Sequence, residues 1–292
     1  MADVAVEIRD RVGLGWRPEL AAATLGHLDT VDVVEVIADD WFGASARRLR
    51  ALRTLASQVP VVLHGVSLGL ASSQSVALSR LEAMARVADA ARPEFWSEHL
   101  AFVRAGGYEI GHLAAPPRSA DTVEGTAANV DHAHRVVGAA PLLENIATLV
   151  EPPGRHHSEA EWVAAALEAS ATGLLLDLHN LHANATNFGF DPLAFLEHIP
   201  AARLRAVHLA GGRWITAPDG RPRVLDDHLH DVPEPVFALL EEVAARAPRS
   251  LTVILERDGR YPPFPVLQQQ MDAARRALAA GRKRRADREA AA

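Results

Sequence analysis

The stretch Val61-Val62-Leu63-His64 has the composition of a short buried strand that ends in a metal-type ligand. Five further apolar runs along the chain end in, or lead into, a histidine or a carboxylate. They are Phe95-Trp96-Ser97-Glu98-His99, Leu142-Leu143-Glu144, Leu174-Leu175-Leu176-Asp177, Ala206-Val207-His208 and Val253-Ile254-Leu255-Glu256. Strand ends from distant parts of a sequence meet on one face of a parallel barrel. We therefore expect these polar side chains to converge on one site, because burying each without a partner is costly.

Strand-like and helix-like segments alternate along almost the whole chain. Val61–His64, for instance, is followed by Ser75–Ala91, where apolar residues recur at helical spacing. Eight such strand–helix pairs predict an α/β fold, a single (β/α)8 TIM barrel over residues 1–280. An open doubly wound sheet is the alternative, but no Gly-x-Gly-x-x-Gly turn follows an early strand. Residues 281–292 (GRKRRADREAAA) are expected to form a flexible basic tail.

Two connections are long for a compact barrel. Ala101–Thr122 contains two adjacent glycines and a proline pair, and is interpreted as a hairpin or lid. Ala210–Pro233 contains the run Asp226-Asp227-His228, which adds a seventh group of metal-type ligands. Long loops on the carboxyl-terminal face of a barrel are where substrate sites form.

Composition excludes several classes of protein. The 292 residues include no cysteine, so disulfides and thiolate-bound metals are excluded and any metal must bind nitrogen and oxygen. A net charge of -7 disfavours nucleic-acid binding. The sequence contains no run of about 18 apolar residues, so no membrane span is predicted. Met1–Arg11 lacks the apolar core of a signal peptide. A cytoplasmic location is the resulting expectation.

Four imidazoles and four carboxylates form the candidate catalytic and metal-binding set. They are His64, His99, Glu144, Asp177, His208, Asp226, His228 and Glu256. This nitrogen–oxygen mixture suits iron, zinc or manganese. Eight ligands exceed the three or four that one catalytic ion uses, which favours two or three ions with bridging carboxylates. Asn180 is added as a ligand in or near the site, whereas His179 and His182 are undecided between supporting the ligands and packing.

Each candidate also has an ordinary structural interpretation. A histidine at a strand end is often a hydrogen-bonded core residue. Glu256 followed by Arg257 and Asp258 is compatible with a structural ion pair, and Glu35 with an arginine pair inside the barrel mouth. In a metal-free binding module, the same acids and histidines would form a buried polar network. That interpretation has to apply to six strand ends and one loop together.

Together, these motifs resemble the multinuclear non-haem iron oxidases typified by the methanobactin-biosynthesis enzyme MbnB and its relative TglH. The resemblance covers about Gly13 to Asp258 and rests on Gly13-Leu-Gly-Trp-Arg17, Val34-Glu-Val36, His64-Gly65, Ser97-Glu-His-Leu100, Leu143-Glu-Asn145, Leu176-Asp177 with Asn180, Asn187-x-Gly-Phe-Asp-Pro192, His208-Leu-Ala-Gly-Gly212, Asp226-x-His228 and Glu256-Arg-Asp258. It implies a barrel with two or three irons, for which zinc or manganese can substitute on isolation. The irons use O2 to modify a cysteine, or a neighbouring residue, of a ribosomally made precursor peptide. It also implies a separate partner protein that helps to recognise the peptide.

The chain departs from this family at two places. His179-Asn180-Leu181-His182 stands where the family often has Asn-Asn-x-Tyr, and Phe188 stands where it often has histidine. These changes affect the expected substrate contacts and the third metal.

The order of ligands also resembles the trinuclear zinc endonucleases of abasic-site repair and, more loosely, the xylose-isomerase-like sugar enzymes. Asn180, where the repair enzymes have histidine, and the acidic net charge count against the first. The second commonly uses a lysine, and Lys283 is the one lysine in the chain.

Overall fold

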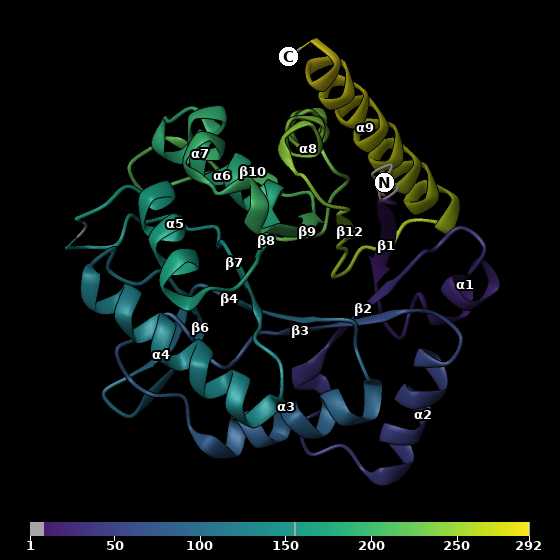
Figure 1. Ribbon diagram of the computed structural model, residues 1–292, viewed down its shortest axis with the longest axis horizontal. Helices are drawn as coiled ribbons and strands as arrows, with labels where there is room; N and C mark the ends of the chain where they lie inside the picture. The colour runs from purple at the N-terminus through teal and green to yellow at the C-terminus, as the bar shows by residue number, and fades with distance from the viewer. Residues whose placement is uncertain (1–8, 155, 292) are drawn as a thin grey trace, which may run out of the picture.

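The computed structural model describes residues 9–154 and 156–291, and its main sheet is a closed barrel of parallel strands (Figure 1). Around the barrel these strands are β1 (Arg11–Gly15), β2 (Val34–Ile37), β3 (Val61–Gly65), β4 (Trp96–His99), β7 (Leu142–Glu144), β8 (Leu174–Asp177), β9 (Leu204–Leu209) and β12 (Thr252–Leu255). β12 pairs with β1 and closes the ring. The predicted (β/α)8 barrel is confirmed.

Helices surround the barrel and cover its outer face (Figure 1). They are α1 (Ala21–Gly26), α2 (Ala46–Ala56), α3 (Leu78–Ala91), α4 (Ala120–Val137), α5 (Glu159–Ser170), α6 (Leu178–Phe188), α7 (Pro192–His198), α8 (Glu234–Arg246) and α9 (Phe264–Ala291), with 3-10 turns η1 (Ala38–Trp41) and η2 (Ala201–Arg203). The apolar stripe of α3 (Leu81, Met84 and Val87) is buried as its spacing predicts. Among the described residues, no helix is long and apolar enough to cross a membrane.

The register of the parallel strands places candidate ligands side by side. Asp177 at the end of β8 is opposite His208 in β9, and His99 at the end of β4 is opposite Glu144 in β7. Paired residues of neighbouring strands point to the same side of a sheet. The hydrogen-bonding pattern that closes the barrel therefore also brings these four side chains together.

Two antiparallel hairpins leave the barrel at its carboxyl-terminal end. The first, β5 (Phe102–Ala105) with β6 (Tyr108–Ala114), lies where a hairpin or lid was expected. The second, β10 (Arg213–Thr216) with β11 (Pro222–Leu225), lies within the long connection 210–233, for which only a loop was predicted.

A helix that the sequence did not indicate starts directly after β8. One helix was predicted after each strand, but this unit has two, because α6 precedes α7. The carboxylate of Asp177 accepts a hydrogen bond from the backbone N–H of Asn180 and so caps α6. Asp177 thereby ends the strand and begins the helix, with no linking residue between them.

The expectation of a flexible basic tail is wrong for residues 281–291, which continue α9. Gly281 is buried, and a side chain there would contact the Glu241 carbonyl of α8. Arg282 donates to the carbonyls of Ala244 and Ala247, which lie at the end of α8 and carry its negative dipole. The positive charge of Arg282 therefore stabilises the packing of α9 against α8. Residue 292 lies outside the described residues.

Replacing Arg282 with alanine should destabilise this contact. Its guanidinium also pairs with Asp10, which precedes β1, so the substitution removes several charge-assisted hydrogen bonds at once. We expect the free energy of unfolding to fall by about 2 kcal/mol, measured by urea denaturation. Lys283→Ala, at the neighbouring exposed position, is the matched control and should have little effect. Equal stability of the two variants would contradict the prediction.

Candidate metal centre

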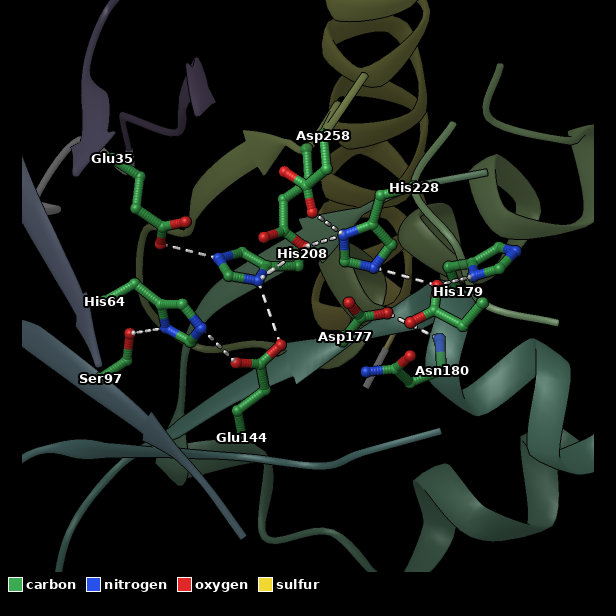
Figure 2. Close-up of polar contacts among 12 residues, drawn as sticks. Glu35, His64, Ser97, Glu144, Asp177, His179, Asn180, His208, His228 and Asp258 are labelled. Atoms are coloured by element: carbon green, nitrogen blue, oxygen red, sulfur yellow. Dashed lines mark hydrogen bonds and ion pairs between the residues drawn. The ribbon is translucent and has the colours of Figure 1, made fainter. Parts of the chain in front are cut away.

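The nine predicted ligands gather at the carboxyl-terminal end of the barrel, and Figure 2 shows most of them pointing toward one another. His64, His99, Glu144, Asp177 and His208 occupy the last or second-last position of their strands. The remaining four lie just beyond strands. Glu256 comes directly after β12, Asn180 lies in the first turn of α6, which follows β8, and Asp226 and His228 follow β11. The predicted convergence is confirmed.

The carboxylate of Glu144 is shared by three imidazoles. Its Oε2 lies 3.4 Å from Nε2 of His64 and 3.4 Å from Nε2 of His99, and its Oε1 lies 3.1 Å from Nδ1 of His208. Two compact donor sets meet at this residue, each with ligand atoms within 4.8 Å of one another. One set is His64, His99 and Glu144, and the other is Glu144, Asp177, His208 and Glu256.

Buried polar atoms without hydrogen-bond partners concentrate in this cluster. Among the described residues they are Glu35 Oε1, Asp39 Oδ1, His99 Nδ1, Glu144 Oε2, Asp177 Oδ2, Asn180 Oδ1, His228 Nε2 and Glu256 Oε2. Six of the eight belong to predicted ligands. Buried groups of this kind normally have partners, because losing water without replacement is costly. Cations bound between them would supply the missing interactions, so the residues present fit a metal cluster.

Asp226 and His228 form a separate, loop-borne part of the site. Oδ1 of Asp226 lies 2.7 Å from Nδ1 of His179 and 3.0 Å from Nε2 of His228. Burial alone would raise the pKa of Asp226, but these two histidines lower it overall. His179 therefore supports a candidate ligand, which the sequence left undecided. His182 lies farther out, with its ring 6.4 Å from that of His179.

Ser97 and Glu35 form hydrogen bonds with two candidate ligand histidines, at the ring nitrogens that face away from Glu144. Nδ1 of His64 donates to Ser97 Oγ at 2.8 Å, since that hydroxyl faces the Leu63 carbonyl. Nε2 of His208 donates to Glu35 at 2.8 Å. Each bond fixes the ring and points the other nitrogen at Glu144 (Figure 2).

The expectation that Glu35 pairs with an arginine is wrong. Its side chain is completely buried in β2 and contacts His208, a predicted ligand. Sequence reasoning thus missed Glu35 as a residue of the site. The available signal was a carboxylate between two valines in a short apolar strand.

Asn145 and Asn180 anchor the end of β8. Asn145 follows β7 and bonds both backbone groups of Asp177, accepting from its N–H and donating to its carbonyl, each at 2.9 Å. The side-chain amide of Asn180 donates to the Asn145 carbonyl at 3.0 Å, which leaves its Oδ1 directed at no protein donor. Asn180 therefore offers one free carbonyl oxygen beside Asp177.

A cavity of about 500 Å³ opens onto the cluster. His99, Glu144, Asn180, Asp226 and His228 contribute to its wall. The rest of its lining comes from the end of β6, the segment 146–153 after β7, and the end of β11. Both hairpins therefore border the space through which a substrate would reach the buried donors.

Burial or neighbouring charges raise the pKa of two groups in the cluster, which favours their protonated forms. Burial alone would lower the pKa of His208, but Glu256, Glu35 and Glu144 raise it well above its ordinary value. Burial raises the pKa of Asp177 well above its ordinary range, and the charge of Asp226 raises it further. Because metal binding needs neutral imidazoles and charged carboxylates, cations would displace these protons.

The metal-free protein should lose stability in mildly alkaline solution. Burial alone would lower the pKa of His99, but Glu144 and Glu98 raise it from 6.5 to about 9. Its charged form thus stabilises the fold fully below pH 6.5, and this contribution is lost as the pH rises through about 9. We expect the Tm of metal-free protein to fall across this window, and to fall less in His99→Gln. Identical pH dependence in both proteins would refute this role of His99.

Comparison with proteins of known structure shows the fold. An L-ribulose 3-epimerase superposes with a TM-score of 0.58 at 14% identity, covering 94% of this chain and 96% of that one. A xylose isomerase domain protein from Planctomyces limnophilus superposes with a TM-score of 0.58 at 17% identity, covering 96% and 99%. At such identities the likeness shows the xylose-isomerase-like barrel alone.

Comparison of sequences shows the family. Residues 11–279 match the family described as RiPP precursor modification enzyme MbnB/TglH/ChrH. A UPF0276 protein of Streptomyces avermitilis is 36% identical over 91% of this chain, which spans about half (54%) of that relative. A UPF0276 protein of Caulobacter vibrioides is 33% identical over 94% of this chain and 96% of its own length. This chain therefore belongs to the MbnB/TglH/ChrH family of enzymes that modify ribosomally made precursor peptides.

Proposed function

We propose that the chain is a multinuclear iron-dependent oxidase, which uses O2 to modify a cysteine, or an adjacent residue, of a ribosomally synthesised precursor peptide. The family supplies the peptide substrate class. The observation that carries the proposal is Glu144, whose carboxylate belongs to two donor sets at once. A carboxylate shared in this way is suited to bridging two cations.

The donor types favour a redox metal over magnesium or calcium. Four imidazoles among the nine candidate ligands suit iron, whereas the hard divalent cations prefer oxygen alone. His64, His99 and Glu144 would hold one ion, and Glu144, Asp177, His208 and Glu256 a second. Asp226, His228 and Asn180 would hold a third. When bound, iron would supply the electron transfer to O2; zinc and manganese would accept the same donors.

The chain's own residues would bind the substrate and protect the reaction. Glu144, Asp177 and Glu256 are almost completely buried and would offset the charge of the cations. Ser97 and Glu35 accept hydrogen bonds from the imidazoles of His64 and His208 and so fix the orientation of these rings. The 500 Å³ cavity would receive one side chain of an extended peptide, and its hairpin walls would exclude water from that residue.

A separate partner protein that helps to recognise the peptide, and a cytoplasmic location, belong to the same proposal. The reason for the first is the exposed hydrophobic character of the cavity surroundings. Tyr108 is 79% exposed on β6, Val150 is 74% exposed in the segment after β7, and Trp214 is 62% exposed on β10. β6 and the segment after β7 line the cavity, and β10 pairs with β11, which also lines it. Exposed apolar surface beside a cavity commonly marks a contact site.

Two other enzyme classes fit less well. A trinuclear zinc endonuclease needs basic surface for the DNA backbone, whereas this chain carries a net charge of -7. A sugar isomerase or epimerase shares the barrel, but the one lysine of the chain lies in α9, away from the cluster. A metal-free binding module would leave six candidate-ligand atoms without partners.

Replacing Glu256 or His99 with alanine should lower the amount of bound iron and abolish peptide turnover, because each substitution removes a donor from one set. Iron is quantified anaerobically, and turnover is followed as O2 consumption with a cysteine-bearing precursor peptide. His134→Ala, an exposed histidine of α4, is the matched control and should retain both. Unchanged activity in both site variants would reject the assignment.

The same preparation separates oxidase from endonuclease. Wild-type protein loaded with iron should consume O2 in the presence of the peptide and leave abasic DNA intact. Metal-dependent cleavage of abasic DNA, without O2 consumption, would favour the phosphodiesterase alternative.

A further inference from the structure

His228 has an unusual backbone conformation for a candidate ligand. Its φ is +52°, in the left-handed region that residues other than glycine rarely adopt. The residue lies between β11 and α8, outside the regular strands that carry the other histidines. Such a conformation persists only where neighbouring groups hold it, so the groups that hold His228 are of interest.

Asp258 holds His228 at two points, of which Figure 2 shows the side-chain contact. The backbone N–H of Asp258 donates to the carbonyl of His228 at 3.0 Å. The imidazole Nδ1 of His228 donates to Oδ2 of Asp258 at 3.0 Å. One bond fixes the backbone and the other fixes the ring, and together they direct the free Nε2 toward Asp226, 3.0 Å away.

Arg17 in turn holds Asp258. Nε and Nη2 of Arg17 donate to Oδ1 of Asp258 at 3.0 and 2.5 Å, and Nη1 donates to the carbonyl of Trp16 at 2.9 Å. All three nitrogens of the guanidinium are therefore used in these hydrogen bonds. Arg17 follows β1 in the sequence, whereas Asp258 follows β12. The Arg17–Asp258 pair thus links the two strands that close the barrel and reaches His228 from that seam.

The two compact donor sets contain neither Arg17 nor Asp258. His64, His99, Glu144, Asp177 and His208 lie in paired strands, and Glu256 follows β12 with its backbone N–H bonded to the Leu209 carbonyl. Together these residues form both compact donor sets. Asp226 and His228 belong to neither set. His179 holds Asp226 independently, so loss of Asp258 would release His228 alone.

We propose that the Arg17–Asp258 pair is a positioning device for His228, and that Asp226 and His228 form a separable cation position that this device keeps in a binding conformation. The inference rests on the proposed function only in that the cluster binds cations. It assigns Arg17 and Asp258 a role outside the ligand set: they set the occupancy of one position without contacting its ion.

Zn²⁺ alone is the probe for this inference. Metal-free wild type and Asp258→Asn are titrated with Zn²⁺ against a competing chelator, and bound ions are counted after equilibrium dialysis. Asparagine keeps the backbone bond and the size of the side chain, but loses the charge and cannot serve both His228 and Arg17. We expect the weakest binding step to lose roughly 10–100-fold in affinity, the usual effect of removing a partner of a ligand histidine. The tighter steps should be unchanged.

Asp231→Asn is the matched control. Asp231 is an acid of the same connection that pairs with an arginine, Arg257, but does not contact His228. It should bind Zn²⁺ as wild type does. Arg17→Gln provides a second variant, which should weaken the same single step, and serves as the test if Asp258→Asn fails to fold by near-ultraviolet circular dichroism.

The outcomes separate the inference from the proposed function. If wild type binds Zn²⁺ and Asp258→Asn binds it with the same affinities, the positioning role alone is overturned. Equal weakening of every binding step in the variant has the same meaning. A wild-type protein that binds no Zn²⁺ and no iron overturns both. Normal Zn²⁺ binding with selective loss in the variant, but no O2 consumption, supports the positioning role and overturns the oxidase.

Discussion

The contacts between the carboxylate of Glu144 and three buried imidazoles are the interaction on which the rest of the site depends. Glu144 is 2% exposed and faces His64, His99 and His208 from three other strands. Opposite charges that are buried together offset part of their desolvation cost, whereas the loss of one partner leaves the other uncompensated. The surrounding arrangement follows from this requirement. Strand register, the hydrogen bonds that the histidines donate to Glu35 and Ser97, and the loop that carries Asp226 all keep side chains of opposite charge in contact.

The sequence was sufficient to predict the barrel and the convergence of the candidate ligands. Parallel strands have their carboxyl ends on one face, so a polar residue at the end of each apolar run, such as His64 or Asp177, has only one region in which to lie. Glu35 escaped this logic because it lies within β2 and not at its end. A strand of four residues does not reveal from its composition which side chains face the barrel interior.

Other differences have similar physical causes. α6 was missed because its asparagines and histidines suggested a turn with candidate ligands. Its apolar residues Leu178, Leu181 and Ala185 nevertheless recur at helical spacing, and eight of its residues are buried. The arginines of residues 281–291 suggested a solvated end. Arg282, Arg285 and Arg288 instead donate to backbone carbonyls at the end of α8, which no pattern of side chains can indicate. The second hairpin, β10–β11, pairs too few residues to stand out within a long loop.

The pairing of β1 with β12 has a consequence for synthesis of the protein. One edge of β1 is unpaired until β12 has emerged from the ribosome, and β12 contains residues 252–255. Glu256 comes directly after it, so the donor set that includes Glu256 is incomplete on any nascent chain shorter than that. Until then chaperones would meet a partly open sheet with an exposed edge, and cations could bind that donor set only after β12 has been made.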